Sequence, residues 1–128
     1  MVQYKVLVVD DEPDVVAFLE RTLRADGHEV LTAYDGIAAL DVASTDKPDL
    51  IILDIMMPMM SGYEVCEQLK SNPATQQIPV MCLSSAHSPD ARAKSMRVGA
   101  VNLVTKPFMP AELLAQVRRY LPKTDATA

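Results

Sequence analysis

The chain has 128 residues, about half of them hydrophobic, and a net charge of −5. This length suits one compact domain that needs no disulfide or structural metal to stay folded. The acidic balance and the lack of a basic run argue against direct nucleic-acid binding, which depends on clustered Lys and Arg.

The sequence also gives no support for a membrane or exported protein, or for a cysteine-based metal site. The first residues, MVQYKVLVV, carry no export signal and are too short to cross a membrane, so we expect no membrane association. Cys66 and Cys82 stand in apolar segments without metal-ligand spacing. We expect both to be buried, reduced thiols of a cytoplasmic protein.

Apolar runs alternate with amphipathic stretches along the chain. In order, the pattern predicts a strand at 4–9, a helix at 13–25, a strand at 29–33, a helix from 35 to about 44, a strand at 50–53, a helix from 61 to about 72, a strand at 80–83, a helix starting at 88, a strand at 101–104 and a helix at 110–121. Residues 1–122 are thus predicted to form one domain, and 123–128 a flexible tail or the start of a linker.

Local signals support several of these boundaries. Gly27 is expected to end the first helix, and Asp35 to cap the second. Ser61 and Glu64 have capping-box spacing, while Ser88-Pro89-Asp90 combines a capping side chain, a first-turn proline and an early acid.

The predicted strands are aliphatic and alternate with helices, which indicates an α/β fold with a doubly wound, five-stranded parallel sheet covered on both faces. Polar residues follow four of the strands: Asp10, Asp11, Asp54, Ser84 and Lys106. In such a sheet the carboxyl ends of the strands share one edge, where ligands bind. A strand order of 2-1-3-4-5 would make the first and third strands neighbours and bring three carboxylates together at that edge.

This set of side chains suits metal-assisted phosphoryl transfer. Three clustered carboxylates repel one another unless a cation neutralises them, and Mg²⁺ binds carboxylates, water and phosphoryl oxygens. A carboxylate such as Asp54 can act as the nucleophile and form an aspartyl-phosphate. Lys106 and the Ser84 hydroxyl could then balance and bind the phosphoryl oxygens.

Each of these residues also has an ordinary interpretation when taken alone. Asp10 or Asp11 could simply cap the first helix, and Ser84 could bond to backbone at a strand end. Lys106 could be a solvated surface charge. Their joint occurrence at one sheet edge argues against coincidence.

Four separated stretches, VLVVDDEPDV, PDLIILDIMMP, IPVMCLSSA and VTKPF, agree in order and spacing with blocks of one family. From about Tyr4 to Leu121 the sequence resembles the response-regulator receiver domains of two-component signalling, similar to chemotaxis receivers. The resemblance implies a flavodoxin-like fold with strand order 2-1-3-4-5.

The resemblance also implies a role for each matching position. Asp54 matches the phosphoacceptor, Asp11 the direct Mg²⁺ ligand and Asp10 the acid that holds the metal through water. The backbone carbonyl of Met56 matches the remaining protein ligand. Ser84 matches the hydroxyl that bonds the phosphoryl group. Lys106 matches the partner of the phosphorylated aspartate and precedes a proline, Pro107, whose peptide bond is often cis in the family.

By this resemblance the protein is expected to be a signalling phosphoacceptor rather than an enzyme with turnover, although it assists its own phosphorylation and dephosphorylation. The expected partners are a sensor histidine kinase or phosphotransfer protein and a downstream effector or output domain. The surface expected to change on phosphorylation is the face made by the fourth helix, the fifth strand and the fifth helix. Homodimerisation on phosphorylation is common in the family.

The sequence departs from the family pattern at three positions. Leu103 stands where an aromatic residue is usual. The family's usual switch, in which an aromatic ring rotates after the Ser or Thr hydroxyl moves inward, is therefore not expected in its ordinary form. Met59 follows Pro58 where the family usually has Gly, in a run with four Met in five positions. That run favours ordinary loop and core filling over a soft contact surface. Met109 stands where a capping Asp or Ser is common, which should weaken the last helix by roughly 1 kcal/mol.

Two residues flank the predicted phosphorylation site at positions that tune phosphoryl lifetime in the family. Met56 and Ala86 are both apolar and should hold an attacking water poorly. This predicts slow loss of the phosphoryl group.

Two other functions fit parts of the pattern. An aspartate-nucleophile phosphatase of the haloacid-dehalogenase type also uses Mg²⁺, Asp and Lys, but its nucleophile ends the first strand in a DxD pattern, whereas this chain has Asp10-Asp11-Glu12. A structural interaction module of the same fold would not need the full set of acids, Ser84 and Lys106.

Overall fold

The computed structural model describes residues 3–85 and 89–122. Strands and helices alternate from one end of this part of the chain to the other. They are β1 (Lys5–Val9), α1 (Pro13–Ala25), β2 (Glu29–Ala33), α2 (Gly36–Asp46), β3 (Leu50–Asp54), α3 (Gly62–Ser71), β4 (Val80–Ser84), α4 (Pro89–Arg97), β5 (Asn102–Thr105) and α5 (Pro110–Tyr120).

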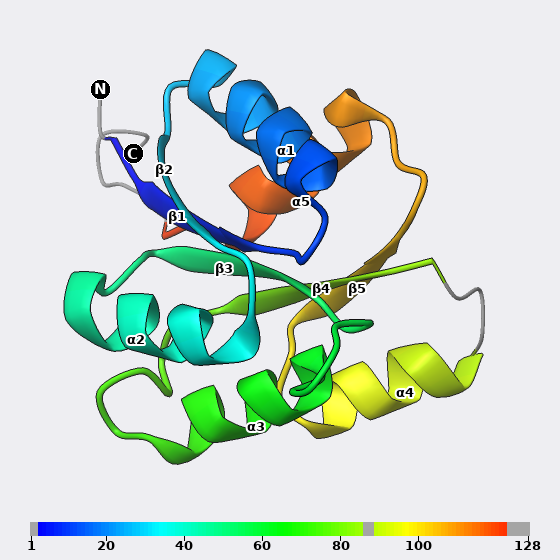
Figure 1. Ribbon diagram of the computed structural model, residues 1–128. Coiled ribbons are helices and arrows are strands. Elements are labelled where there is room, and N and C mark those ends of the chain that lie inside the picture. Colours follow the sequence, from blue (N-terminus) through cyan, green and yellow to red (C-terminus); the bar gives the residue numbers. More distant parts are fainter. Residues whose placement is uncertain (1–2, 86–88, 123–128) are drawn as a thin grey trace.

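All neighbouring strands are parallel, and the sheet order is β2-β1-β3-β4-β5. Figure 1 shows α1 and α5 on one face of the sheet and α2, α3 and α4 on the other. The chain therefore has the predicted doubly wound α/β fold, and its strand order reverses between β1 and β3.

The alternation of side chains along each strand explains why the sheet has two cores. On β3, Leu50 and Ile52 pack with α1 and α5, while Ile51 and Leu53 pack with the helices of the other face. Successive side chains of a strand point to opposite faces, so a strand covered on both sides must be apolar at every position. All five residues of β3 and of β4 are buried accordingly.

The predicted boundaries hold to within two residues where the described residues test them. Ser61 and Glu64 form the expected capping box of α3, and the Asp35 carboxylate accepts from the Ala38 N–H at 2.8 Å to cap α2. Gly27 lies just after α1 with φ +92°, a left-handed conformation that suits glycine. β5 begins one residue later than predicted. The capping role of Ser88 and the tail at 123–128 lie outside the described residues.

The two cysteines are free and buried, as expected for core thiols. Burial raises the pKa of Cys66 to about 11 and that of Cys82 to about 12, so both remain protonated at neutral pH. Within residues 3–85 and 89–122, every helix is too short or too polar to cross a membrane.

The departures at Met59 and Met109 have local structural consequences. Met109 is the N-cap of α5 and makes no side-chain capping bond, as its apolar side chain predicts. Met59 has φ +68°, and the Met60 N–H donates to the Pro58 carbonyl at 2.8 Å across it. Such a three-residue turn is strained for a residue with a Cβ.

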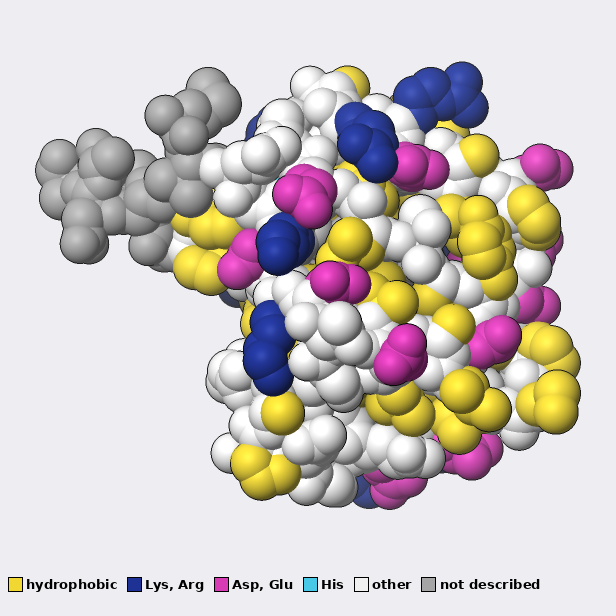
Figure 2. Space-filling view, turned by 60° about the vertical axis from the view of Figure 1, so that its left-hand side comes forward, with side chains coloured by type: hydrophobic (Ala, Val, Ile, Leu, Met, Phe, Trp, Pro, Cys, Tyr) yellow, Lys and Arg dark blue, Asp and Glu magenta, His cyan; other side chains and the backbone are white. Residues whose placement is uncertain are grey.

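The run of methionines divides between core and surface. Met57 is buried and Met60 partly buried in the core beside α2 and α3, whereas Met56 and Met59 are exposed. Figure 2 shows a face where hydrophobic side chains gather with acidic side chains between them. Filling of the core therefore accounts for half of the run.

Replacing Met59 with Gly should raise the free energy of unfolding by about 1 kcal/mol, because Gly removes the Cβ strain at positive φ. Urea unfolding of the two proteins measures the difference. Met56→Gly, on the same loop but at an ordinary φ, serves as the control and should bring no gain. A loss of stability in Met59→Gly would contradict this account of the turn.

Candidate functional site

The candidate site lies at the carboxyl edge of the sheet, where β1, β3, β4 and β5 end. Asp10 follows β1, while Asp54 and Ser84 are the last residues of β3 and β4. The Lys106 N–H donates to the Ser84 carbonyl at 2.7 Å, which fixes the segment after β5 beside β4. The parallel order thus brings together residues that are up to 96 positions apart in the sequence.

Three carboxylates converge at this edge. Oxygen atoms of Asp10, Asp11 and Asp54 all lie within 4.8 Å of one another. Asp10 and Asp54 are buried, with 0% and 2% of their surface exposed. Backbone donors support both: the Glu12 N–H donates to Asp10 Oδ1 at 3.0 Å, and the Met56 N–H to Asp54 Oδ1 at 3.3 Å.

Lys106 supplies positive charge to this cluster. Its Nζ donates to Asp10 Oδ2 at 2.9 Å and lies 3.6 Å from Asp54 Oδ1 and 3.8 Å from Glu12 Oε1. Burial by itself would lower the pKa of Lys106, but the hydrogen bond that Lys106 donates to Asp10 and the negative charge of Asp54 outweigh burial and raise the pKa. Lys106 is therefore held as a cation between two strand ends.

The surroundings of Asp54 disfavour its ionised form. Burial, and next the negative charge of Asp10, raise the pKa of Asp54 to about 6, although Lys106 and the Met56 N–H act in the opposite direction. An ionised Asp54 is therefore costly in the folded protein near neutral pH.

A hard divalent cation fits this arrangement. Carboxylate oxygens that repel one another and leave Asp54 with a raised pKa are the donor set that Mg²⁺ binds, with water completing its shell. Asp10, Asp11 and Asp54 are the side chains that could hold it. The part predicted for the Met56 carbonyl stays a prediction.

Ser84 is buried at the end of β4, next to β3, on which Asp54 pairs with Leu83. The structure thus brings Asp10, Asp11, Asp54, Ser84 and Lys106 to one edge, as their positions after the strands predicted. The Lys106–Pro107 peptide bond is cis, as the resemblance implied. Ala86 lies outside the described residues.

Two residues that matter here were not singled out by the sequence pattern. Glu12 approaches Lys106 as a third acid of the Asp10-Asp11-Glu12 run. Gly62 begins α3 so close to β3 that a Cβ there would lie 2.4 Å from the Asp54 carbonyl oxygen. Only glycine permits this contact, which holds α3 against the strand that carries Asp54. A glycine at the start of a predicted helix was the available signal.

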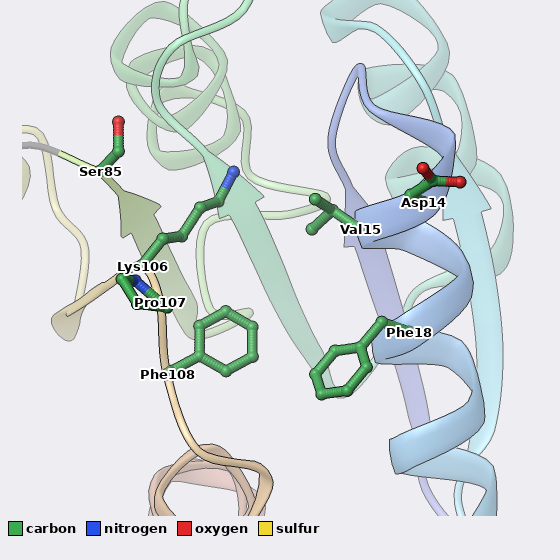
Figure 3. A pocket seen from close by; sticks show the side chains of 7 residues that line it. All are labelled: Asp14, Val15, Phe18, Ser85, Lys106, Pro107 and Phe108. Carbon is green, nitrogen blue, oxygen red and sulfur yellow. The ribbon is translucent and has the colours of Figure 1, made fainter.

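An apolar hollow of about 430 Å³ opens beside Lys106. Figure 3 shows Val15 and Phe18 of α1 facing Phe108 from the segment after β5, with Lys106 and Ser85 at the upper rim. The rings of Phe18 and Phe108 are tilted, with centroids 6.0 Å apart. The hollow places apolar surface directly beside the acidic cluster.

Leu103 is buried in the core, and hydrogen bonds join the elements on either side of it. Arg92 of α4 donates to the Leu103 carbonyl at 3.1 Å and to Asn102 Oδ1 at 3.0 Å. Asn102 Nδ2 in turn donates to Gln116 Oε1 of α5 at 3.0 Å. The α4–β5–α5 face is thus connected by polar contacts rather than by an aromatic side chain at position 103.

Comparison with known proteins gives consistent results. The family model "Response regulator receiver domain" matches residues 6–118. The chain is 40% identical over 97% of its length to the alkaline phosphatase synthesis transcriptional regulatory protein PhoP of Bacillus subtilis, and covers 51% of that protein. It thus spans about half the length of the curated relatives it matches.

Solved structures agree with the fold. The chemotaxis protein CheY4 of Vibrio cholerae matches with a TM-score of 0.89 and 35% identity, over 94% of this chain and 100% of that one. The receiver domain of sensor histidine kinase PA1611 from Pseudomonas aeruginosa, described with a magnesium ion coordinated in its active-site cleft, matches with a TM-score of 0.85 and 26% identity, over 93% and 98% of the two chains.

Replacing Asp54 with Asn should stabilise the metal-free protein at pH 8 by about 2 kcal/mol. The pKa of Asp54 is raised to about 6, so the folded state binds its proton more tightly than the unfolded state does. The wild type therefore loses stability relative to the variant as pH rises from about 4 to about 7, and the difference vanishes below pH 4. Urea unfolding across this range measures it.

Asp41→Asn, at an exposed acid of α2, is the matched control and should show no such pH-dependent gain. Mg²⁺ should stabilise the wild type more than Asp54→Asn, because it binds the folded carboxylate cluster. An Asp54→Asn difference that does not change between pH 4 and pH 8 would contradict the assignment.

Proposed function

Because the chain belongs to the receiver domain family of two-component response regulators, we propose that Asp54 accepts a phosphoryl group from the phosphohistidine of a sensor histidine kinase or phosphotransfer protein. The observation that carries this proposal is the convergence of Asp10, Asp11 and Asp54 with Lys106 at one sheet edge. The protein acts here as a signalling phosphoacceptor, without turnover of a free substrate.

The transfer exchanges one bond to phosphorus for another. A carboxylate oxygen of Asp54 attacks the phosphorus, the P–O bond forms, and the P–N bond to the imidazole breaks. The imidazole nitrogen leaves with the electron pair. Asp10, Asp11 and Asp54, with the Met56 carbonyl, would hold Mg²⁺, which would supply positive charge to the phosphoryl oxygens.

The chain's own side chains take the remaining roles. Lys106, already 3.6 Å from Asp54 Oδ1, pairs with a phosphoryl oxygen. The Ser84 hydroxyl donates to another oxygen. The backbone N–H of Met56 holds Asp54 Oδ1 in position for attack.

The apolar hollow suits docking of the phosphodonor. Val15, Phe18 and Phe108 present apolar surface beside Lys106, so a donor helix can bury its own apolar side chains there while its phosphohistidine reaches Asp54 (Figure 3). Figure 3 also places Ser85 and Asp14 at the rim, where polar groups of the donor would lie.

Phosphorylation then biases the α4–β5–α5 face between two states. Movement of Ser84 and Lys106 toward the phosphoryl group displaces the ends of β4 and β5, since the Lys106 N–H is bonded to the Ser84 carbonyl. The contacts from Arg92 through Asn102 to Gln116 carry this shift to both helices. An output domain or a separate effector reads the face, and the phosphorylated form can pair with a second copy through it.

Exposure to acetyl phosphate and Mg²⁺ should add one phosphoryl group to the chain, seen by intact-mass spectrometry, and Asp54→Asn should show none. Lys106→Ala should still accept the phosphoryl group. Its α4–β5–α5 face should respond only weakly, because Lys106 binds the phosphoryl oxygens after transfer. Asp41→Asn should behave as the wild type. Absence of an adduct with every donor would refute the proposal.

Hydrolysis of added phosphate esters at enzymic rates would instead favour the phosphatase alternative. Asp10, the acid that follows β1, is paired with Lys106 at 2.9 Å, closer than the 3.6 Å between Lys106 and Asp54 Oδ1, and this tighter pairing disfavours Asp10 as the nucleophile.

The aspartyl-phosphate should be long-lived, with a half-life of minutes to hours in the absence of a phosphatase. The exposed side chain of Met56, beside the site, is apolar and has no polar group that could position an attacking water. Met56→Asn should shorten the half-life by up to about tenfold, because an amide can hold that water in place. Met59→Asn puts the same amide on the same loop and should change little. A wild-type half-life of seconds would contradict this prediction.

A further inference from the structure

A second hollow lies on the α2 side of the molecule, apart from the one beside Lys106. It is formed by the first turn of α2 (residues 35–38, with Asp41) and by residues 58–60 of the loop between β3 and α3, and encloses about 550 Å³. We call this the methionine groove. The proposed phosphoryl transfer uses none of the side chains that line it.

Apolar side chains are concentrated at and next to this groove. Of the seven large hydrophobic side chains that are exposed within residues 3–85 and 89–122, four are Tyr34, Ile37, Met56 and Met59. Ile37 is 71% exposed and Met59 fully exposed, and both line the groove. Figure 2 shows such a face, with hydrophobic side chains gathered and acidic ones between them. Exposed clusters of this kind mark interaction sites.

The floor of the groove is tightly packed. Gly36 begins α2, and a Cβ there would lie 2.8 Å from the Met60 sulfur and 2.9 Å from Val65 Cγ2. Met60 therefore packs against bare backbone and fastens the loop to α2. The walls are thus preformed, while the exposed Met59 side chain remains free to adapt to a partner's shape.

Met59 occupies a position where its backbone conformation is unfavourable. It has φ +68° within the turn closed by the Met60 N–H and the Pro58 carbonyl. Gly would suit this turn better, yet the chain places a long apolar side chain there and points it into solvent. Its side chain stabilises nothing within the domain, which points to a contact outside it.

The charge around the groove identifies the occupant. Asp35 and Asp41 line it, no Lys or Arg does, and the whole chain carries a net charge of −5. A basic partner is attracted to such a rim. A second copy of this face would bring like acids together, and an anionic lipid surface would be repelled.

We propose that the methionine groove binds an amphipathic helix of a partner protein, with apolar side chains on one face and Lys or Arg along its borders. The apolar face lies on Ile37 and Met59, and the basic residues reach Asp35 and Asp41. This is helix-in-groove recognition, and it is independent of phosphoryl transfer to Asp54.

Three short synthetic peptides labelled with fluorescein test the proposal by fluorescence anisotropy with the full chain. The first has Leu at i, i+3, i+4 and i+7 and Lys elsewhere, the second has the same composition with Leu on all faces, and the third has Glu in place of Lys. The first should bind in the micromolar range and the others much more weakly. Amide shifts of ¹⁵N-labelled protein should cluster at residues 35–41 and 56–60.

Variants separate groove binding from general attraction to an acidic protein. Met59→Gly, which should fold at least as stably as the wild type, and Ile37→Ser should each weaken binding of the first peptide by roughly tenfold. Asp41→Asn should weaken it by roughly twofold to threefold. Met96→Gln, at an exposed methionine of α4, is the matched control and should leave binding unchanged.

Equal binding of the first two peptides, or unchanged binding by Met59→Gly, would overturn the proposal. So would sedimentation that shows Ile37-dependent self-association, since the occupant would then be a second copy. Ile37-dependent binding to phosphatidylglycerol vesicles would assign the groove to a lipid surface instead. None of these results depends on whether Asp54 accepts phosphate.

Discussion

The mutual repulsion of Asp10, Asp11 and Asp54 is the constraint on which the site depends. Two of these carboxylates are buried, and one lysine lies between them, so the folded chain holds more negative charge at this edge than it neutralises itself. Burial, and next the negative charge of Asp10, raise the pKa of Asp54 accordingly. A domain that keeps such a cluster gives up stability near neutral pH, and a divalent cation or a phosphoryl group with its counter-charges can relieve the cost.

The rest of the fold serves to hold this cluster in place. Both cores pack against strands that are buried on both faces, which makes the sheet a stiff support for the residues at its edge. Gly62 lets α3 approach the Asp54 carbonyl, so α3 packs directly against the end of the strand that carries Asp54. The connection from Lys106 to Ser84 and from Arg92 to α5 gives the same edge a route to the α4–β5–α5 face without an aromatic residue at 103.

The loop between β3 and α3 connects the acidic cluster to the methionine groove. Its first residues hold Asp54, and its later residues, Met59 and Met60, form one wall of the methionine groove. On the opposite side, Phe18 and Phe108 line the hollow beside Lys106. The described part of the chain thus carries two separate hollows lined by apolar side chains, one beside Lys106 and one at the start of α2.

The sequence by itself determined the α/β class, nearly every element boundary and the five polar residues at the sheet edge, because strand and helix periodicity and capping are local properties. It could not show that Glu12 approaches Lys106 or that Gly62 is required beside Asp54, since both depend on contacts between distant elements. It favoured ordinary loop and core filling for the four loop methionines without saying which were which, and only tertiary packing separated buried Met57 and partly buried Met60 from exposed Met56 and Met59. All four residues are methionine, so residue type cannot distinguish them. Burial depends on which side of the loop meets α2 and α3.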